Sequence, residues 1–280
     1  MDRKWWTLVA VCTATFMLLL DITVVNVALP AIERDLNADL ADLQWVVDAY
    51  ALTLAALLLT GGSLADRIGR RRVFLIGLVV FTIASVLCGL ATSPLTLNLA
   101  RALQGVGGAF MFATSLALIA STYSGRDRGT ALGLWGATTG AAVAVGPLVG
   151  GVLTEGIGWE AIFFVNVPIG IAAVALTLAR VEESSNPQAG RLDWAGTVLF
   201  SGALFLLIFG LIRGNPEGWS SAPIVASLGG AAVLLLAFVL VERRIEHPML
   251  ELGLFRVPAF DGPEDPVRHR SHPREVTDAA

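Results

Sequence analysis

The sequence predicts an all-α protein that crosses a lipid bilayer eight times. Hydrophobic residues make up 55% of the 280 residues and charged residues only 15%, whereas soluble domains carry about 25% charged residues. The mean hydropathy is +0.71, and the apolar residues form eight runs of helix length. A transmembrane β-barrel would show shorter segments of alternating polarity. These observations exclude an ordinary water-soluble enzyme, and no concentrated basic face indicates a nucleic-acid partner.

The eight runs are separated by polar loops, and each approaches the roughly 20 residues that a bilayer-spanning helix needs. They are Trp5–Pro30, Trp45–Ala65, Val73–Ala91, Leu95–Ser121, Thr130–Leu153, Ala161–Ala179, Trp194–Ile212 and Pro223–Val241. The first run is predicted to be retained, because it is long and lacks a clear signal cleavage site. The polar stretch 181–193 is predicted to be a cytoplasmic linker between a six-span unit, residues 1–180, and two additional spans in 194–243.

The loop charges predict which side of the membrane each loop faces, because Lys and Arg favour the cytoplasmic side. With the N-terminus inside, twelve basic residues fall inside and only two, Arg34 and Arg213, fall outside. The twelve are Arg3, Lys4, Arg67, Arg70, Arg71, Arg72, Arg126, Arg128, Arg180, Arg191, Arg243 and Arg244. The sequence therefore predicts a multi-pass protein of the cell (inner) membrane with both termini in the cytoplasm.

Two ionisable residues, Asp21 and Arg101, lie deep inside the predicted spans. At about 1.5 Å of rise per residue, both fall at a similar depth in the outer half of the membrane, so they can pair if their helices are neighbours. Burial favours the neutral form of a carboxyl group and a nearby guanidinium favours the charged form. A small rearrangement can therefore switch the protonation of Asp21, and intramembrane charges mark functional sites by default. A static structural ion pair is the alternative.

Three further polar residues are candidates for the same site. Asp48 lies on the second span, nearer the outer surface, and can join the pair. Gln104 lies one turn from Arg101 on the same helix face. Asn26 follows Asp21 by an angle of about 140° around the helix, so the two cannot face one cavity equally. One of them is expected to bond a neighbouring helix.

Small residues form a stripe along the fifth predicted span. Its members, at steps of four, three, four and four residues, are Gly136, Gly140, Val143, Pro147 and Gly151. Such a stripe lets another backbone approach closely, and Pro147 can kink the helix. Generic membrane packing is the alternative interpretation.

The loop between the second and third spans has the charged pattern Gly62-Ser-Leu-Ala-Asp66-Arg67-Ile-Gly69-Arg70-Arg71-Arg72. Gly69 allows a tight turn, and Asp66 can accept hydrogen bonds from Arg or from a helix N-terminus. The Arg cluster suits the inner membrane face, although a charge run alone would be only an orientation signal.

Five segments resemble, at fitting spacing, motifs of the major facilitator superfamily and of its fourteen-span drug:proton antiporters. They are the first-span segment Leu20–Pro30, the loop Gly62–Arg72, the fourth-span segment Arg101–Gly108, the fifth-span segment Gly140–Gly151 and the start of the sixth span, Gly158–Gly170. The resemblance covers about residues 5–260. It implies a bundle of inverted three-span repeats and a central cavity between two six-span halves, with spans seven and eight as an extra pair.

The resemblance also implies a function, the proton-coupled efflux of hydrophobic or cationic drugs. Residues for proton coupling or substrate contact are Asp21, Arg101, Asp48, Gln104 and Asn26. The gating loop contains Gly62, Asp66, Arg67, Gly69, Arg70 and Arg71. The antiporter motif of the fifth span contains Gly140, Gly146, Pro147, Gly150 and Gly151. The expected partners are the substrates, protons and the lipid bilayer, and no enzymatic activity, cofactor or metal is expected.

The C-terminal end departs from the family pattern. Family members continue with six more spans, whereas here an amphipathic approach segment, 244–260, is followed by a polar tail, 261–280, that is expected to be disordered. We interpret the tail as the product of truncation or a frameshift, with a real short family member as the alternative, and we do not expect its His269 and His272 to form a metal site. Two other functions stay open: a non-transporting membrane fragment, which could self-associate, and a metabolite transporter of the same superfamily. Residues 1–280 are expected to insert without exporting drugs alone.

Overall fold

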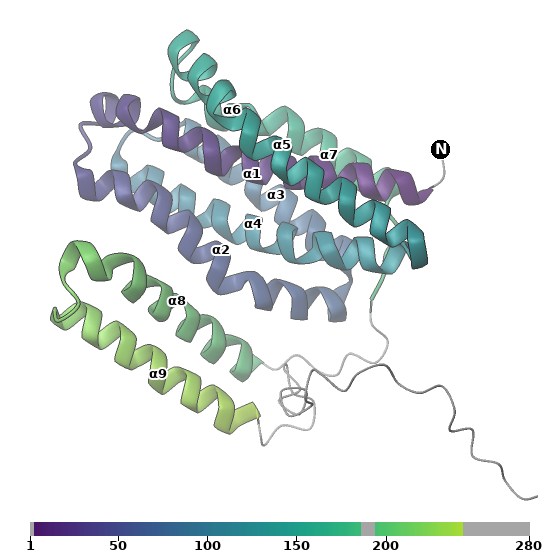
Figure 1. The fold of residues 1–280 in the computed structure, drawn as a ribbon. Helices are drawn as coiled ribbons and strands as arrows, with labels where there is room; N and C mark the ends of the chain where they lie inside the picture. The colour runs from purple at the N-terminus through teal and green to yellow at the C-terminus, as the bar shows by residue number, and fades with distance from the viewer. Residues whose placement is uncertain (1–2, 186–193, 243–280) are drawn as a thin grey trace, which may run out of the picture. The chain divides into compact units, whose positions relative to one another are not determined.

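The structure is all-helical, as the sequence predicts. In the computed structural model, residues 3–185 and 194–242 are described, and every regular element among them is a helix (Figure 1). Eight helical segments in these ranges are long and apolar enough to cross a membrane. The predicted approach segment, the polar tail and residues 186–193 of the linker lie outside the described residues.

The helices of the six-span unit follow the predicted runs. They are α1 (Arg3–Leu36), α2 (Leu40–Ile68), α3 (Arg70–Gly89), α4 (Pro94–Thr122), α5 (Gly125–Gly156), and α6 (Ala161–Phe164) with α7 (Asn166–Arg180), which together form the sixth span. The additional spans are α8 (Trp194–Glu217) and α9 (Ala222–Glu242). α1 continues through Pro30 to Leu36, beyond the predicted end of its span. Proline removes one backbone hydrogen bond, and a membrane helix can tolerate this loss.

Local sequence signals determine where α2 and α4 begin. The Asp39 carboxylate accepts the Asp42 N–H at 2.8 Å, and the Asp42 carboxylate accepts the Asp39 N–H at 3.3 Å. Ser93 and Thr96 form the same reciprocal capping box before α4. Such boxes satisfy the backbone donors that a helix start leaves free. Asn98 Nδ2 in the second turn of α4 donates to the Asp42 carbonyl in the first turn of α2 at 3.4 Å, so both helices start at the same end of the bundle.

Glycines allow α4 to pack closely between α2 and α3. A Cβ atom added to Gly105 would lie 2.5 Å from the carbonyl oxygen of Tyr50 on α2, and one added to Gly107 would lie 2.5 Å from the Phe81 nitrogen on α3. Real Cβ atoms do not approach backbone atoms so closely. Small residues at these positions therefore hold α4 at the centre of the unit.

The small-residue stripe predicted on the fifth span does not pack against another helix of the described chain. Its exposed members are Gly136, Gly140, Val143 and Pro147. A Cβ atom added to Gly136, Gly140 or Gly151 would meet nothing within 4 Å. No helix of the described residues approaches this face, so a close backbone approach here stays a prediction. α5 is also assigned as one helix through Pro147.

α5 instead meets α1 through a neighbouring face that contains Gly146 and Gly150. A Cβ atom added to Gly150 would lie 3.1 Å from the Val24 Cα atom, and one added to Gly146 would overlap the Thr23 hydroxyl. Two glycines four residues apart let the two backbones approach, as in other membrane helix pairs. Two of the five antiporter-motif residues therefore pack inside the unit.

Two apolar clusters fill the six-span unit. Buried members of the first include Leu8, Met17, Leu18, Tyr50, Phe81 and Met111. Buried members of the second include Leu20, Val24, Val46, Leu97, Trp159 and Phe163. On α1 the first cluster ends at Leu18 and the second begins at Leu20. The boundary between the buried members of the two clusters therefore lies at Leu19, two residues before Asp21.

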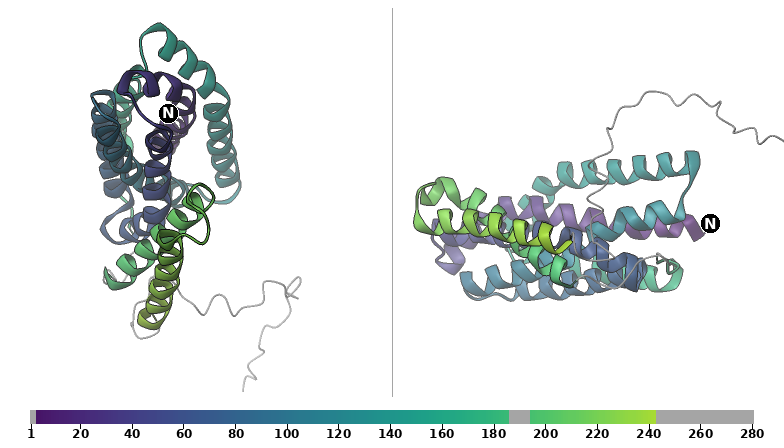
Figure 2. Two further views of the ribbon diagram at one scale, coloured as in Figure 1. Left: turned by 90° about the vertical axis from the view of Figure 1, so that its left-hand side faces the viewer. Right: turned by 90° about the horizontal axis from the view of Figure 1, so that it is seen from below.

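α8 and α9 pair with each other, and α8 packs on α2 (Figures 1 and 2). The hydroxyl groups of Thr60 and Ser201 lie 2.6 Å apart across this contact. At the far end of α8, Arg213 Nη1 donates to Gln44 Oε1 at 3.1 Å. The hairpin of α8 and α9 is therefore joined to the six-span unit along one face of α2.

Candidate functional site

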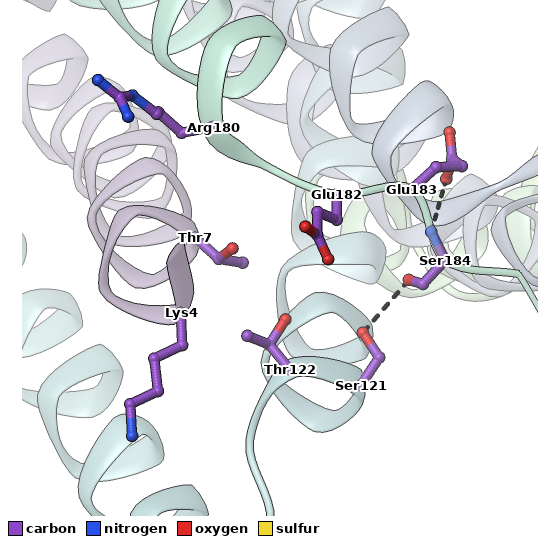
Figure 3. A pocket seen from close by; sticks show the side chains of 8 residues that line it. All are labelled: Lys4, Thr7, Ser121, Thr122, Arg180, Glu182, Glu183 and Ser184. Carbon is purple, nitrogen blue, oxygen red and sulfur yellow. Dashed lines mark hydrogen bonds between the residues drawn. The ribbon is translucent and has the colours of Figure 1, made fainter. Parts of the chain in front are cut away.

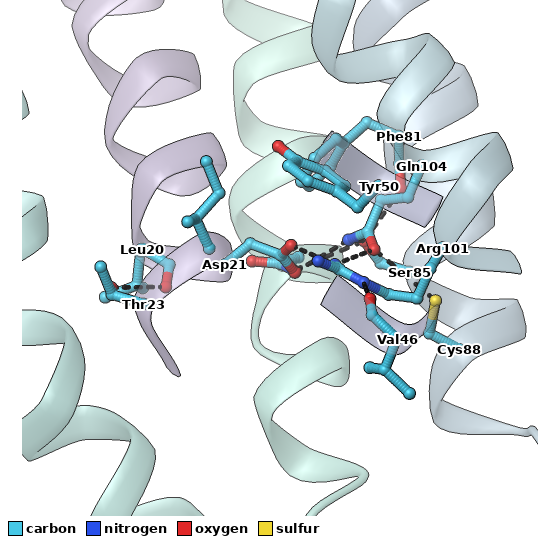
Figure 4. Close-up of polar contacts among 12 residues, drawn as sticks. Leu20, Asp21, Thr23, Val46, Tyr50, Phe81, Ser85, Cys88, Arg101 and Gln104 are labelled. Carbon is cyan, nitrogen blue, oxygen red and sulfur yellow. Dashed lines mark hydrogen bonds and ion pairs between the residues drawn. The ribbon is translucent and has the colours of Figure 1, made fainter. Parts of the chain in front are cut away.

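The carboxylate of Asp21 lies at the centre of a buried hydrogen-bond network (Figure 4). Its Oδ2 accepts from Arg101 Nη1 at 2.5 Å. Its Oδ1 accepts from Gln104 Nε2 and from Asn166 Nδ2, each at 2.8 Å. Asp21 has no exposed surface. The structure thus brings together Asp21, Arg101 and Gln104, three of the five residues that the sequence predicts for proton coupling.

The Arg101 side chain lies within a membrane span, and several neighbouring groups contact its guanidinium. Its Nε donates to the Val46 carbonyl at 2.9 Å, and its Nη1 also donates to Gln104 Oε1 at 2.7 Å. The guanidinium lies over the Tyr50 ring, 4.3 Å from Cζ to the ring centroid. These contacts compensate for the water that the charge has lost. Removing one member of such a pair leaves an uncompensated charge and costs about 3–5 kcal/mol.

Ser85 and Asn166 complete the network, although the sequence did not single them out as site residues. Ser85 Oγ accepts from Gln104 Nε2 at 2.9 Å and from Asn166 Nδ2 at 3.4 Å, and it donates to the Phe81 carbonyl at 2.8 Å. Asn166 is the only amide in the sixth apolar run, and that isolation was the available signal. Ser85 gave no signal, because serine is common in membrane helices.

The network is closed at both ends by the two apolar clusters. Asp21 follows the boundary between them, and no side chain of the network is more than 2% exposed. Helices α1, α2, α3, α4 and α7 all contribute a group to it. Gly170, one turn after Asn166, brings α7 close to α3, because a Cβ atom there would overlap the Thr82 side chain. These helices therefore bury the Asp21 carboxylate completely in the observed structure.

Asn26 and Asp48 lie outside the network. Asn26 is exposed, and its amide donates to the Ile22 carbonyl of its own helix at 3.1 Å. Asp48 is half-buried on α2 and makes no hydrogen bond or ion pair within residues 3–185 and 194–242. Two residues along a helix turn by about 200°, so the contacts of Val46 and Tyr50 with Arg101 place Asp48 on another face. These two residues are therefore not part of the buried network, and their role in proton coupling or substrate contact stays a prediction.

The predicted gating loop is joined to the segment that follows α7. Asp66 Oδ1 accepts from Arg70 Nε at 3.1 Å and from Arg70 Nη2 at 2.8 Å. Gly69 has φ +113°, and a Cβ atom there would lie 2.5 Å from the Glu183 carboxyl carbon. Glu183 Oε1 accepts the Arg71 N–H at 3.0 Å, a favourable place for an anion at the start of α3. The sequence missed Glu183, which belongs to the predicted linker.

The remaining loop residues make fewer contacts. Gly62 is half-buried, and a Cβ atom there would meet nothing within 4 Å. Arg67 is half-buried, and its Nη1 has no hydrogen-bond partner among the described residues. Arg71 Nη2 donates to the Leu178 carbonyl at 2.8 Å. The loop is thus held mainly through Gly69, Arg70 and Arg71.

A polar cavity of about 310 Å³ lies beside this loop, where α1 begins and α4 and α7 end (Figure 3). It is lined by Lys4, Thr7, Ser121, Thr122, Arg180, Glu182, Glu183 and Ser184. The Ser121 and Ser184 hydroxyl groups lie 3.3 Å apart. Because its lining carries both signs of charge, the cavity favours neither anions nor cations strongly.

Curated relatives share this sequence over most of its length. The chain is 40% identical over 255 residues to the tetracenomycin C resistance and export protein of Streptomyces glaucescens, which covers 91% of this chain and 47% of the relative. It is 42% identical over 251 residues to the multidrug resistance protein Stp of Mycobacterium tuberculosis, covering 89% and 47%. It is 41% identical over 253 residues to a puromycin resistance protein of Streptomyces alboniger, covering 90% and 50%. The chain spans about half the length of these relatives, whose names are those of resistance and export proteins rather than enzymes.

The fold and the family comparison agree with this similarity. A crystal structure of the peptide transporter POT matches with a TM-score of 0.62 over 88% of this chain and 57% of the other, at 14% identity. That likeness supports the fold alone. The family model described as Major Facilitator Superfamily matches residues 11–255, a range that includes the whole buried network. The chain therefore belongs to the major facilitator superfamily.

Proposed function

We propose that this chain is the proton-coupling part of an exporter that expels hydrophobic or cationic compounds in exchange for protons, in the fourteen-span branch of the superfamily. The observation that carries the proposal is the complete burial of Asp21 against Arg101 inside two membrane spans. An unpaired charge inside the membrane is energetically costly. We therefore expect Asp21 and Arg101 to separate when Asp21 takes up a proton. The names of the relatives support the class of compound.

The geometry supports a defined role for each partner. When Asp21 gains a proton, its attraction for Arg101 falls, and α1 and α4 lose their charged link. Arg101 keeps its hydrogen bond to the Val46 carbonyl and its contact with the Tyr50 ring. These two groups of α2 continue to stabilise its charge. Protonation thus weakens the bond between α1 and its neighbours selectively. A proton-dependent link between helices is what alternating access needs if protons are to drive it.

The experiment is to add tetraphenylphosphonium, a hydrophobic cation, to the purified chain in lightly buffered detergent and to follow the release of protons with a pH dye. The wild-type chain is expected to release protons as the cation binds, and Asp21→Asn is expected to release none. Asp48→Asn is the matched control, because it changes a half-buried carboxylate outside the network. Proton release by Asp21→Asn would contradict the proposal. If Asp48→Asn also failed to release protons, Asp48 would belong to the site, contrary to the observed network.

Expression of residues 1–280 by themselves tests for transport by this unit alone. Alternating access moves two halves around a midplane site, and the chain corresponds to about half of its relatives' length. We therefore expect no fall in ethidium accumulation in cells that express residues 1–280 without a full-length relative. A fall that Asp21→Asn abolishes would show that this unit exports by itself or by self-association.

We further propose that the chain lies in the cell (inner) membrane with its N-terminus and its Arg-rich loop in the cytoplasm. The distribution of Lys and Arg supports this orientation. In chains whose own cysteines are replaced by serine, Arg72→Cys is expected to react with a membrane-impermeant maleimide only after the cells are opened. Asn37→Cys, an exposed position between α1 and α2, is expected to react in intact cells. The reverse pattern would invert the topology.

A further inference from the structure

Only the NH₂ group of the Asn166 side-chain amide forms hydrogen bonds within the described residues. Its Nδ2 donates to Asp21 Oδ1 at 2.8 Å and to Ser85 Oγ at 3.4 Å. Its Oδ1 is buried and has no hydrogen-bond partner among the described residues. Asn166 has no exposed surface, and a buried amide oxygen without a donor is destabilising. This orphaned acceptor lies on the amide that contacts the proposed proton carrier.

In the observed arrangement, Asp21 has only donors as partners. Arg101 Nη1 donates to Oδ2, and the amide groups of Gln104 and Asn166 donate to Oδ1. This set suits a carboxylate, which only accepts, but a protonated carboxyl also donates through its O–H. A proton on either oxygen would face a donor. Protonation therefore requires that one partner present an acceptor.

Gln104 is poorly placed to do so. Its Oε1 accepts from Arg101 Nη1 at 2.7 Å and from Cys88 Sγ at 3.6 Å. Turning its amide would break both bonds and direct an NH₂ group at the guanidinium. Asn166 Oδ1 has no bond to lose, and apart from the Asp21 bond only the 3.4 Å contact with Ser85 is given up. The terminal torsion of asparagine is broad and roughly two-fold, which allows such a turn.

We propose that Asn166 is a positioning residue whose amide turns when Asp21 is protonated, so that its Oδ1 accepts the new O–H. The inference rests on the proposed proton cycle at Asp21. A proton from solution joins Asp21 Oδ1, the N–H bond from Asn166 is replaced by an O–H bond to Asn166, and no covalent bond of the amide changes. One amide thereby stabilises both forms of a carboxyl group that water does not reach.

Other ionisable groups near Asp21 are accounted for. Arg101 approaches from α4, the Tyr50 phenol from α2 beside the guanidinium, and the Cys88 thiol from α3 beside Gln104. Within residues 3–185 and 194–242, no ionisable side chain of α5 or α7 bonds to Asp21. The Tyr50 hydroxyl is also buried without a partner among the described residues, but neither it nor the Cys88 thiol bonds Asp21 in the observed arrangement, whereas the Asn166 amide already does. The assignment to Asn166 therefore rests on this existing contact.

The test is infrared spectroscopy of the purified chain at a series of pH values, with the side-chain amide carbonyl of asparagine labelled with ¹³C. On acidification, a carboxyl carbonyl band that is absent in Asp21→Asn is expected to appear. Over the same pH range, one labelled amide band is expected to move to lower wavenumber, because its oxygen gains a hydrogen bond. Asn166→Leu, which keeps the side-chain volume, should abolish this shift, and Asn26→Leu, which removes an exposed asparagine, should leave it in place.

The wild-type spectra make the test independent of how well the variants fold. Asp21→Asn offers a second route, because the amide shift should vanish when nothing triggers the turn. A carboxyl band from Asp21 without any amide shift would overturn this inference and leave the proposed function intact. An amide shift that survives Asn166→Leu would overturn it as well. If Asp21 never gives a carboxyl band, both the inference and the proposed function fail.

Discussion

The six-span unit and the hairpin of α8 and α9 are both built from apolar helices, yet their contacts differ in kind. In the six-span unit, a buried ion pair ties α1 to α4 through Asp21 and Arg101. The hairpin meets α2 through a hydroxyl pair and through the rings of Trp45 and Phe209, whose centroids lie 6.0 Å apart. Lipid is as apolar as a leucine side chain, so packing and polar contacts decide how membrane helices associate. The comparison indicates that the buried polar network determines how the helices of the six-span unit pack, whereas few polar contacts determine how the hairpin packs on α2.

The largest effect is expected from breaking the polar centre. Arg101→Leu leaves the Asp21 carboxylate buried without its cation, which should lower the free energy of unfolding by about 3–5 kcal/mol. Thermal unfolding of the purified chain, followed by circular dichroism, measures this loss. The double variant Asp21→Asn with Arg101→Leu should recover part of it, because both charges are gone.

Arg213→Leu is the matched control from the hairpin. Arg213 donates to Gln44 on α2 and to Glu217 one turn along α8, and its Cζ lies 5.1 Å from the centroid of the Trp45 ring. Contacts of these kinds contribute about 0–2 kcal/mol, which is less than the loss expected for Arg101→Leu. A loss as large as that of Arg101→Leu would remove the distinction between the two regions.

Glycine substitutions test the helix spacing around the polar centre. Gly105→Ala places a Cβ atom 2.5 Å from the Tyr50 carbonyl oxygen, and such overpacking should cost about 1–3 kcal/mol. Gly136→Ala on α5 meets nothing within 4 Å and should change stability by less than about 1 kcal/mol, in the stabilising direction. Unfolding midpoints of the two variants decide the point. Equal losses would mean that the exposed face of α5 is also packed.

The fate of α5 shows which part of the fold the sequence could predict. Eight spans were predictable, because a bilayer requires long apolar helices. The packed face of α5 was not, because glycines occur on two faces of the helix, and Gly140 faces outward while Gly146 and Gly150 meet α1. In a membrane helix both faces are apolar, so polarity does not indicate the direction of the core.

The candidate site divides in the same way. The shared depth of Asp21 and Arg101 was predictable, because chain position determines it, but their pairing also required α1 and α4 to be neighbours. The contact of Asn166 with Asp21 joins residues 145 apart, and that of Glu183 with Arg71 joins residues 112 apart. The first contact depends on how α7 packs against α1, and the second on where the segment after α7 meets the start of α3. No local pattern encodes either arrangement. The different surroundings of Asp21 and Asn26 were predictable from their angle around the helix, because Asp21 bonds neighbouring helices while Asn26 is exposed and bonds only its own helix among the described residues.

A smaller effect is expected where the linker meets the gating loop. Glu183→Gln keeps an acceptor for the Arg71 and Ser184 N–H groups but removes the charge that faces Arg72 at 3.6 Å. The side chain of Glu183 is partly exposed, so the loss should stay below about 1 kcal/mol. Salt screens such contacts, and the difference in unfolding temperature from wild type should shrink as salt is raised. A difference in unfolding temperature that does not change with salt concentration would indicate a steric cause.

The smallest effect is expected at the contact between α2 and α8. Thr60→Val removes the hydroxyl pair with Ser201, and a hydrogen bond between membrane helices averages about 0.6 kcal/mol. Because the six-span unit keeps its own network, backbone hydrogen exchange should rise in α8 and stay constant in α4. Thr139→Val is the matched control, since the Thr139 hydroxyl donates to the Trp135 carbonyl of its own helix, α5. Faster exchange in α4 after Thr60→Val would show that the hairpin supports the polar centre after all.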